Sequence, residues 1–124
     1  MPSFLDLLGL RRRRAPRVAA CWPVEVRVPG CDRLERFHAT DVSTTGVRLE
    51  GGTPGGVRQL LSPDGRARLR LHLPGSAVAL EVEARLCWGL GDPLRTGWQF
   101  AGLRRRDLRS LAAYVADRTG QPPD

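Results

Sequence analysis

The sequence predicts a mainly β protein: a six-stranded antiparallel β-barrel, closed or nearly closed, with one C-terminal α-helix. Three observations lead to this prediction. Apolar residues alternate with polar ones over six short stretches, glycine and proline separate these stretches, and the apolar spacing becomes helical near the C-terminus. An open sheet would leave unpaired edge strands, and closure into a barrel removes them. The chain of 124 residues is long enough for one such core, so we expect a single domain.

The first half of the chain contains three of the expected strands. Residues 18–28 alternate with period two and end at the turn signal Pro29-Gly30. The second strand is expected at about residues 36–42 and the third at 47–50. The segment 51–65 is rich in glycine and proline, and we therefore expect it to be a loop.

The second half contains the other three strands and the helix. Alternation predicts strands at residues 67–73, 78–88 and 95–101, of which the middle one is the longest. A helix is expected at about residues 104–118, with its apolar stripe packed over one end of the barrel. The stripe consists of Leu108, Leu111, Ala112 and Val115.

The cysteines do not indicate a metal site. Cys21, Cys31 and Cys87 are odd in number and widely spaced, and only two histidines are present, so we expect neither a disulfide framework nor a bound metal. Cys21 and Cys87 each lie in an apolar run and are expected to be small core residues.

Other classes of protein are also disfavoured. No apolar run approaches the roughly 18 residues of a membrane span, so membrane insertion is not expected. The apolar lead-in at residues 1–10 is interrupted by Asp6, and the positive charges follow it, whereas in a secretory signal they precede the apolar stretch. We therefore expect a cytoplasmic location. The sequence shows no nucleophile–base pair, metal set or glycine-rich phosphate loop, so we expect no enzymatic activity and no cofactor.

The positive charge is concentrated near the N-terminus. The net charge is +7, and all 20 basic residues are arginines, five of which lie within the segment 11–17. A coding bias towards arginine would explain the missing lysines but not this cluster. Like charges repel one another, so we expect residues 11–17 to form an exposed arm, and its guanidinium groups suit an anionic partner.

Two local patterns accompany this charge. Arg13 and Arg17 form R-x-x-x-R just before the first expected strand, and Asp41, Ser43 and Gly46 form D-x-S-x-x-G at a turn between two strands. Each pattern also has a purely structural interpretation. The arginines could form a solvated arm or a sequence-blind nucleic-acid contact, and Asp41 and Ser43 could serve only to close the turn.

Together, the two patterns resemble those of the PilZ domain family. Their order and spacing fit the family, as do Pro23-Val24, Leu73-Pro74, the segment 84–88, the segment 97–100 and a closing helix from Asp107 to Val115. The resemblance implies a domain over residues 11–120, built as a six-stranded barrel plus helix. It also implies that the ligand is cyclic di-GMP.

The residues of both patterns suit that ligand. Arg13 and Arg17 can bind phosphate or the O6/N7 edge of guanine, and Asp41 can accept hydrogen bonds from guanine N–H groups. Ser43 offers a hydroxyl, and Gly46 permits a positive φ and lets the ligand approach the backbone.

Three further residues are candidate ligand contacts. Arg12 and Arg14 flank the arginine pair, and the resemblance links an arginine at the place of Arg12 to binding of a stacked ligand pair. Trp88 corresponds to a place where some members of the family stack an aromatic ring on guanine. Strand alternation, however, puts Trp88 on the face of Leu80 and Leu86, which favours core packing equally.

The leading functional hypothesis is a cyclic di-GMP receptor that orders its arginine arm on binding and signals to a protein partner. The resemblance implies a role in motility or biofilm control. One alternative is a PilZ-like interaction module that binds no nucleotide and docks through residues 1–10. Another is a basic barrel that binds single-stranded nucleic acid, but most aromatic residues fall on expected core faces, and DNA is not expected as a partner.

Overall fold

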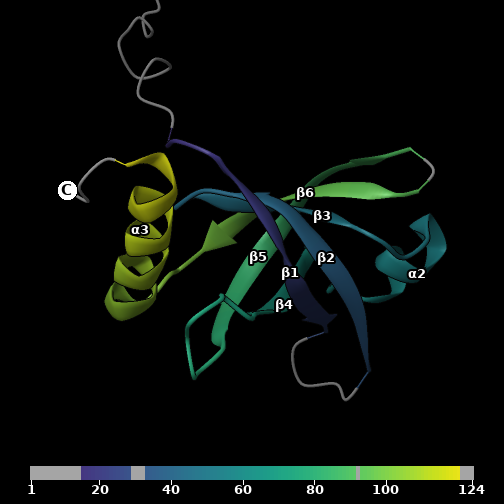
Figure 1. Cartoon of the computed structure of the whole chain (residues 1–124). Helices are drawn as coiled ribbons and strands as arrows, with labels where there is room; N and C mark the ends of the chain where they lie inside the picture. Colours follow the sequence, from purple (N-terminus) through teal and green to yellow (C-terminus); the bar gives the residue numbers. More distant parts are fainter. Residues whose placement is uncertain (1–14, 29–32, 92, 121–124) are drawn as a thin grey trace, which may run out of the picture.

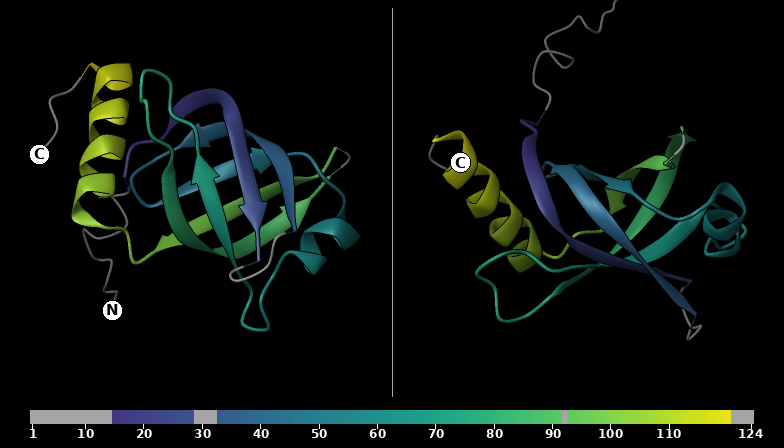
Figure 2. Two further views of the ribbon diagram at one scale, coloured as in Figure 1. Left: turned by 90° about the horizontal axis from the view of Figure 1, so that it is seen from below. Right: turned by 45° about the vertical axis from the view of Figure 1, so that its right-hand side comes forward.

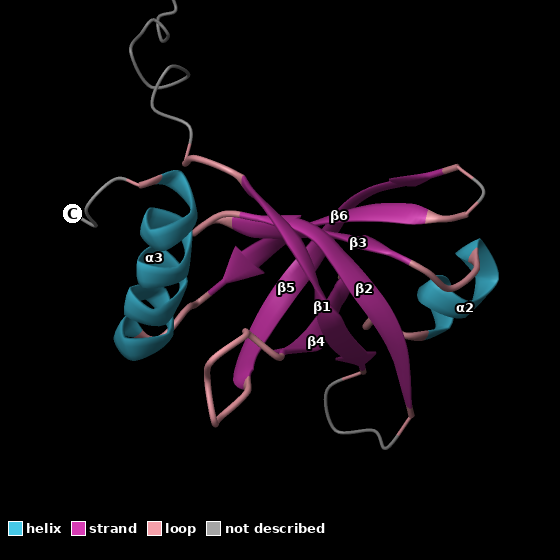
Figure 3. Ribbon diagram, in the orientation of Figure 1, coloured by secondary structure: helices cyan, strands magenta, loops and turns pink. Residues whose placement is uncertain are grey.

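The computed structural model describes residues 15–28, 33–91 and 93–120. They form the predicted closed antiparallel barrel, with strand order β1-β2-β3-β6-β5-β4 and β4 paired back to β1 (Figures 1 and 3). The strands are β1 (Val18–Arg27), β2 (Leu34–Val42), β3 (Gly46–Glu50), β4 (Arg66–Leu71), β5 (Leu80–Leu90) and β6 (Arg95–Ala101). The two helices within the described residues are α2 (Pro54–Gln59) and α3 (Arg105–Thr119). The expected lead-in at 1–10 and the arginines at 11–14 lie outside the described residues.

Alternation along the strands fills the barrel with aliphatic side chains. Val24 and Val26 of β1 and Leu69 and Leu71 of β4 are fully buried, and each such side chain contributes roughly 1.5–3 kcal/mol of burial free energy. The largest fully buried apolar side chains are Leu49, Leu60, Leu69, Leu71, Leu111, Val24, Val26, Val42 and Val47. The interior is therefore a packed core, and any binding surface has to lie outside it.

The expected loop at 51–65 contains the short helix α2, so that part of the prediction was wrong. Thr53 caps the helix: its Oγ1 accepts a hydrogen bond from the Gly56 N–H at 3.0 Å. Pro54 stands at the start of the helix, where a backbone N–H has no partner within the helix, so the missing N–H of proline costs no hydrogen bond. The cap and the proline thus offset the poor helix propensity of the two glycines that follow.

Helix α3 lies at the end of the barrel where β1 begins, opposite α2 (Figure 2). Trp22 on β1 donates a hydrogen bond from Nε1 to the Tyr114 hydroxyl at 3.0 Å, and the two rings meet edge to face. Leu111 and Val115 are buried as predicted, but Leu108 is 42% exposed, so its assignment to the buried stripe was wrong. The buried row instead includes Asp107, which Arg104 neutralises through a 3.0 Å ion pair.

The cysteine prediction was also wrong, because Cys21 and Cys87 are both exposed. Each lies where a strand is irregular: β1 shifts register between Ala19 and Trp22, and β5 between Leu86 and Trp88. An extra residue at a bulge leaves the inward–outward alternation of its strand, so an apolar run does not ensure burial there.

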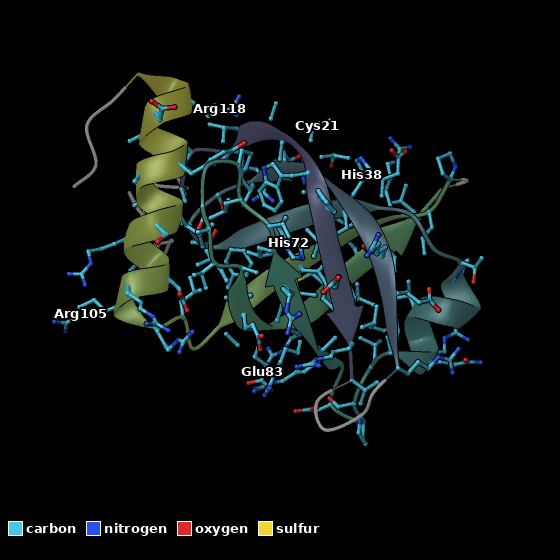
Figure 4. All side chains as sticks on the ribbon, turned by 60° about the horizontal axis from the view of Figure 1, so that its bottom comes forward. Cys21, His38, His72, Glu83, Arg105 and Arg118 are labelled. Atoms are coloured by element: carbon cyan, nitrogen blue, oxygen red, sulfur yellow. The ribbon has the colours of Figure 1, made fainter. Side chains whose placement is uncertain are left out.

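The described residues contain no group of three or more His, Cys, Asp or Glu side chains that could hold a metal ion. Neither helix in the described part of the chain combines the length and the apolar character needed to cross a bilayer. Most charged side chains project from the outer surface; Arg105 and Arg118, for example, lie on α3, and Arg105 extends away from the barrel (Figure 4).

Candidate functional site

Ser43 closes the turn between β2 and β3. Its Oγ accepts hydrogen bonds from the N–H groups of Thr45 at 3.1 Å and Gly46 at 3.2 Å, while its own N–H donates to the Gly46 carbonyl at 2.9 Å. The residue is fully buried. The hydroxyl therefore satisfies backbone donors of the turn, which gives the neighbouring residues a fixed position.

Asp41 faces outward because β2 carries a bulge beside it. Ala39 pairs with Leu49 and Asp41 pairs with Arg48, which leaves Thr40 as an extra residue between the two pairs. Strict alternation from the buried Ala39 would have put Asp41 inside the barrel. The bulge re-aims the carboxylate to the surface, where it is available for binding.

Both carboxylate oxygens of Asp41 have arginine partners. Arg17 Nε donates to Oδ1 at 2.7 Å and Arg48 Nη1 donates to Oδ2 at 3.3 Å. Arg17 Nη1 also donates to Ser43 Oγ at 3.4 Å. The structure thus brings together Arg17, Asp41 and Ser43, and Arg48 gives the cluster an excess of positive charge.

Gly46 has a structural reason to be glycine other than backbone conformation. Its φ is not in the left-handed region, so it does not use the positive φ that glycine permits. A Cβ at this position would instead clash with the backbone carbonyl oxygen of Trp98, well inside 3.0 Å. The absence of a side chain lets β3 and β6 approach each other at the start of their ladder.

Trp88 does not follow the alternation of β5. Leu80, Val82 and Ala84 are buried, but the bulge at Cys87 turns Trp88 outward, where it is 39% exposed. The interpretation of Trp88 as a core residue was therefore wrong. Its ring lies over Gly97 on the neighbouring strand β6.

Trp88, Gly97, Arg48 and Asp41 lie in one row across the outer face. Trp88 pairs with Gly97, Gly97 pairs with Arg48, and Arg48 pairs with Asp41, so the row crosses β5, β6, β3 and β2. Three steps between neighbouring strands span about 14 Å. The Arg48 guanidinium carbon lies 5.9 Å from the centroid of the Trp88 ring, within reach of a cation–π contact.

A pocket of about 190 Å³ opens along this row. Its lining residues are Arg17, Thr45, Gly46, Arg48, Cys87, Trp88, Gly97, Trp98 and Gln99. The guanidinium groups of Arg17 and Arg48 can bind phosphate oxygens or the guanine O6/N7 edge, and the exposed indole of Trp88 can stack on a base. Asp41 lies beside the pocket and holds both guanidinium groups. The pocket therefore suits an anionic ligand that carries an aromatic base.

Sequence reasoning missed Arg48 and Gly97. Arg48 lies between the buried Val47 and Leu49, and this alternation was the available signal that its side chain points outward. Nothing in the sequence alone indicates that it faces Asp41 and Trp88. The predicted contacts Arg12, Arg13 and Arg14 lie outside the described residues.

Comparison with known proteins supports the fold. Among solved structures, the motility inhibitor MotI/DgrA of Bacillus subtilis matches with a TM-score of 0.70 at 20% identity, over 87% of this chain and 51% of that one. This chain therefore spans about half the length of that protein. The PilZ domain of CeSA from a cellulose-synthesizing bacterium matches with a TM-score of 0.59 at 21% identity, over 86% of this chain and 97% of that domain.

The PilZ domain of YcgR from Escherichia coli, solved with c-di-GMP, matches with a TM-score of 0.62 at 17% identity, over 88% of this chain and 92% of that one. At such identities the likeness shows a shared fold. No curated protein sequence matches significantly. The PilZ domain family model, however, matches residues 11–117, which is most of the sequence. This chain belongs to the PilZ domain family.

Proposed function

We propose that this protein is a cytoplasmic receptor for cyclic di-GMP, with no enzymatic activity, and that residues 11–120 form its ligand-responsive domain. The observation that carries the proposal is the contact of Arg17 with Asp41 and Ser43 beside a pocket walled by an exposed tryptophan. The E. coli YcgR PilZ domain, which shares this fold, was solved with c-di-GMP. Fold alone does not assign a ligand, and the chemistry of the pocket supports cyclic di-GMP.

The polar groups of the site match those of the ligand. Arg17 supplies a planar donor fork for a phosphate or a guanine edge, and Trp88 supplies a ring on which guanine stacks. Asp41 accepts from guanine N1–H and N2–H, donors that arginine cannot satisfy. Gly46 and the buried hydroxyl of Ser43 hold the turn that presents this carboxylate.

Ligand binding entails an exchange of partners at Asp41. In the structure, Arg17 and Arg48 occupy its two oxygens. A guanine that approaches the carboxylate displaces one guanidinium group, which is then free to bind a phosphate. The exchange replaces one charge-assisted hydrogen bond by another, so it does not leave a buried charge unpaired.

The arginine arm completes the site in this proposal. Arg13, with Arg12 and Arg14 beside it, contributes further phosphate or guanine contacts, and residues 11–17 become ordered on the barrel. A protein partner then recognises the changed surface. Amide hydrogen exchange over residues 8–20, measured with and without ligand, tests the ordering, and equal exchange in both states refutes it.

The exposed aromatic residues argue against a general platform for single-stranded nucleic acid. Such platforms stack successive bases on several exposed rings. Of the aromatic side chains in the described part of the chain, Trp88 is the one classed as exposed, while Trp22, Phe37 and Trp98 are buried. One ring fits one base of a small ligand better than a strand of many bases.

Calorimetric titration of cyclic di-GMP at physiological salt tests the receptor proposal. Arg17→Ala and Asp41→Ala should each weaken binding about tenfold or more, because each removes a charge-assisted hydrogen bond of about 1.5–3 kcal/mol. Arg36→Ala is the matched control: Arg36 is an exposed arginine outside the pocket, 3.9 Å from Glu25, and its loss should leave the affinity within about twofold. If the folded wild-type protein does not bind, the receptor proposal is wrong.

A further inference from the structure

Gly97 is a strand glycine without a backbone reason to be glycine. Its φ is not in the left-handed region, and it lies in the middle of β6, paired on both sides with Arg48 and Trp88. Glycine in a strand interior is less stable than alanine, and it often marks a place where another group approaches the backbone closely.

The group that approaches Gly97 is the indole of Trp88. A Cβ at Gly97 would clash with Nε1 and Cε2 of the ring and would lie 2.8 Å from Cζ2. All three atoms belong to one half-exposed side chain and none to the backbone. A methyl group here would therefore displace the ring and leave the strand pairing in place.

The ring position matters because of what lies beside it. With Trp88 seated on Gly97, its indole faces the pocket together with Arg48, whose guanidinium carbon is 5.9 Å from the ring centroid. Asp41 is the next residue in the same row and accepts a hydrogen bond from Arg48. A base stacked on the seated ring therefore lies beside the Arg48 guanidinium, while Asp41 holds that arginine from the other end of the row.

We propose that Gly97 is a positioning residue for nucleotide binding: its missing side chain seats the Trp88 indole flat against β6, so that the ring serves as the base platform. This inference rests on the proposed function, because it assumes that the pocket binds a guanine nucleotide. Gly97 belongs neither to the R-x-x-x-R pattern nor to the D-x-S-x-x-G pattern, and it does not itself touch the base.

A double-mutant cycle tests the inference with cyclic di-GMP as the ligand. Gly97→Ala should weaken binding about fivefold or more in the wild-type background, the lower end of what one base–aromatic stack contributes. In the Trp88→Ala background, the same substitution should change the affinity by less than about twofold, because the ring on which it acts is gone. An equal loss in both backgrounds overturns the inference.

Iodide quenching of tryptophan fluorescence provides a readout that does not need the ligand. Trp22 and Trp98 are each 3% exposed and Trp88 is 39% exposed, so quenching reports mainly on Trp88. Gly97→Ala should raise the quenching constant as the ring leaves its seat. An unchanged constant in a folded variant overturns the inference even if binding is weaker.

Gly89→Ala is the matched control on the neighbouring strand. A Cβ at Gly89 would make only ordinary contacts, with Thr96 Cγ2 at 3.4 Å, so both quenching and affinity should stay as in the wild type. If the wild-type protein does not bind cyclic di-GMP, the proposed function and this inference fail together. If it binds and Gly97→Ala binds equally well, only this inference fails.

Discussion

Replacing Gly46 by alanine should destabilise the fold itself, although Gly46 belongs to the binding pattern. The new Cβ would clash with the Trp98 carbonyl oxygen and would lie 3.4 Å from the carbonyl carbon, so backbone has to move. The new Cβ and the Trp98 carbonyl oxygen have to lie at least about 3 Å apart, so β3 and β6 have to separate at the pair Gly46–Gln99.

The cost follows from the hydrogen bonds at that end of the ladder. The Phe100 N–H donates to the Thr45 carbonyl at 2.9 Å, and the Gly46 N–H donates to Ser43 Oγ at 3.2 Å. Loss of two such bonds at about 1 kcal/mol each, together with about 1–3 kcal/mol of overpacking strain, should lower the free energy of unfolding by about 3–5 kcal/mol.

Urea denaturation followed by circular dichroism measures this change. Gly55→Ala is the control, because a Cβ there meets nothing within 4 Å and alanine favours helix α2, so its midpoint should equal or exceed that of the wild type. If Gly46→Ala unfolds at the wild-type midpoint and loses only ligand binding, Gly46 acts on the ligand and the structural reasoning is refuted.

Two further predictions concern the pocket and the outer charges. Saturating cyclic di-GMP should slow the alkylation of Cys87, which lines the pocket, but should not slow that of Cys21, which is exposed outside the pocket. Peptide mass spectrometry measures both rates, and equal protection of the two cysteines would place the ligand elsewhere. A 2.7 Å hydrogen bond from Arg70 lowers the pKa of Glu81. The ionised carboxylate therefore stabilises the fold at pH values above the unfolded pKa of about 4.3. This stabilisation is lost as the pH falls through the lower pKa of the folded state. Because the side chains of Arg70 and Glu81 are each 40% exposed, Glu81→Gln should lower the free energy of unfolding at pH 7 by less than about 1 kcal/mol. The melting curves of the variant and the wild type should converge towards pH 3, and a difference that grows in acid contradicts this reasoning.

The sequence was sufficient for the barrel because long stretches of the strands alternate strictly between the bulges. Val24 and Val26 on β1 and Leu69 and Leu71 on β4 are all inward, as their spacing predicts. The errors cluster where one extra residue interrupts a strand. Cys87 leaves the alternation of β5 and turns Trp88 outward, and no feature of residue type marks this insertion.

The candidate site was only partly predictable for a related reason. Arg17, Asp41 and Ser43 are carried by recognisable patterns, although Arg17 lies 24 residues before Asp41 and 26 before Ser43. Arg48 and Gly97 enter the site through the register of β3 against β6, two strands separated by 44 residues of chain between Glu50 and Arg95. Closure of the whole barrel sets that register, and local spacing does not contain it.

The row from Trp88 to Asp41 lies on the outside of a barrel whose interior is full. A nucleotide bound along it has protein on one side and solvent on the other, so its outer face becomes part of the molecular surface. A partner that docks there contacts ligand and protein together, and the ligand forms part of the epitope. Thermodynamic reciprocity then requires that the partner tighten nucleotide binding by the same factor by which the nucleotide tightens partner binding. The affinity measured for the isolated domain would therefore be a lower bound on its affinity within the assembled complex.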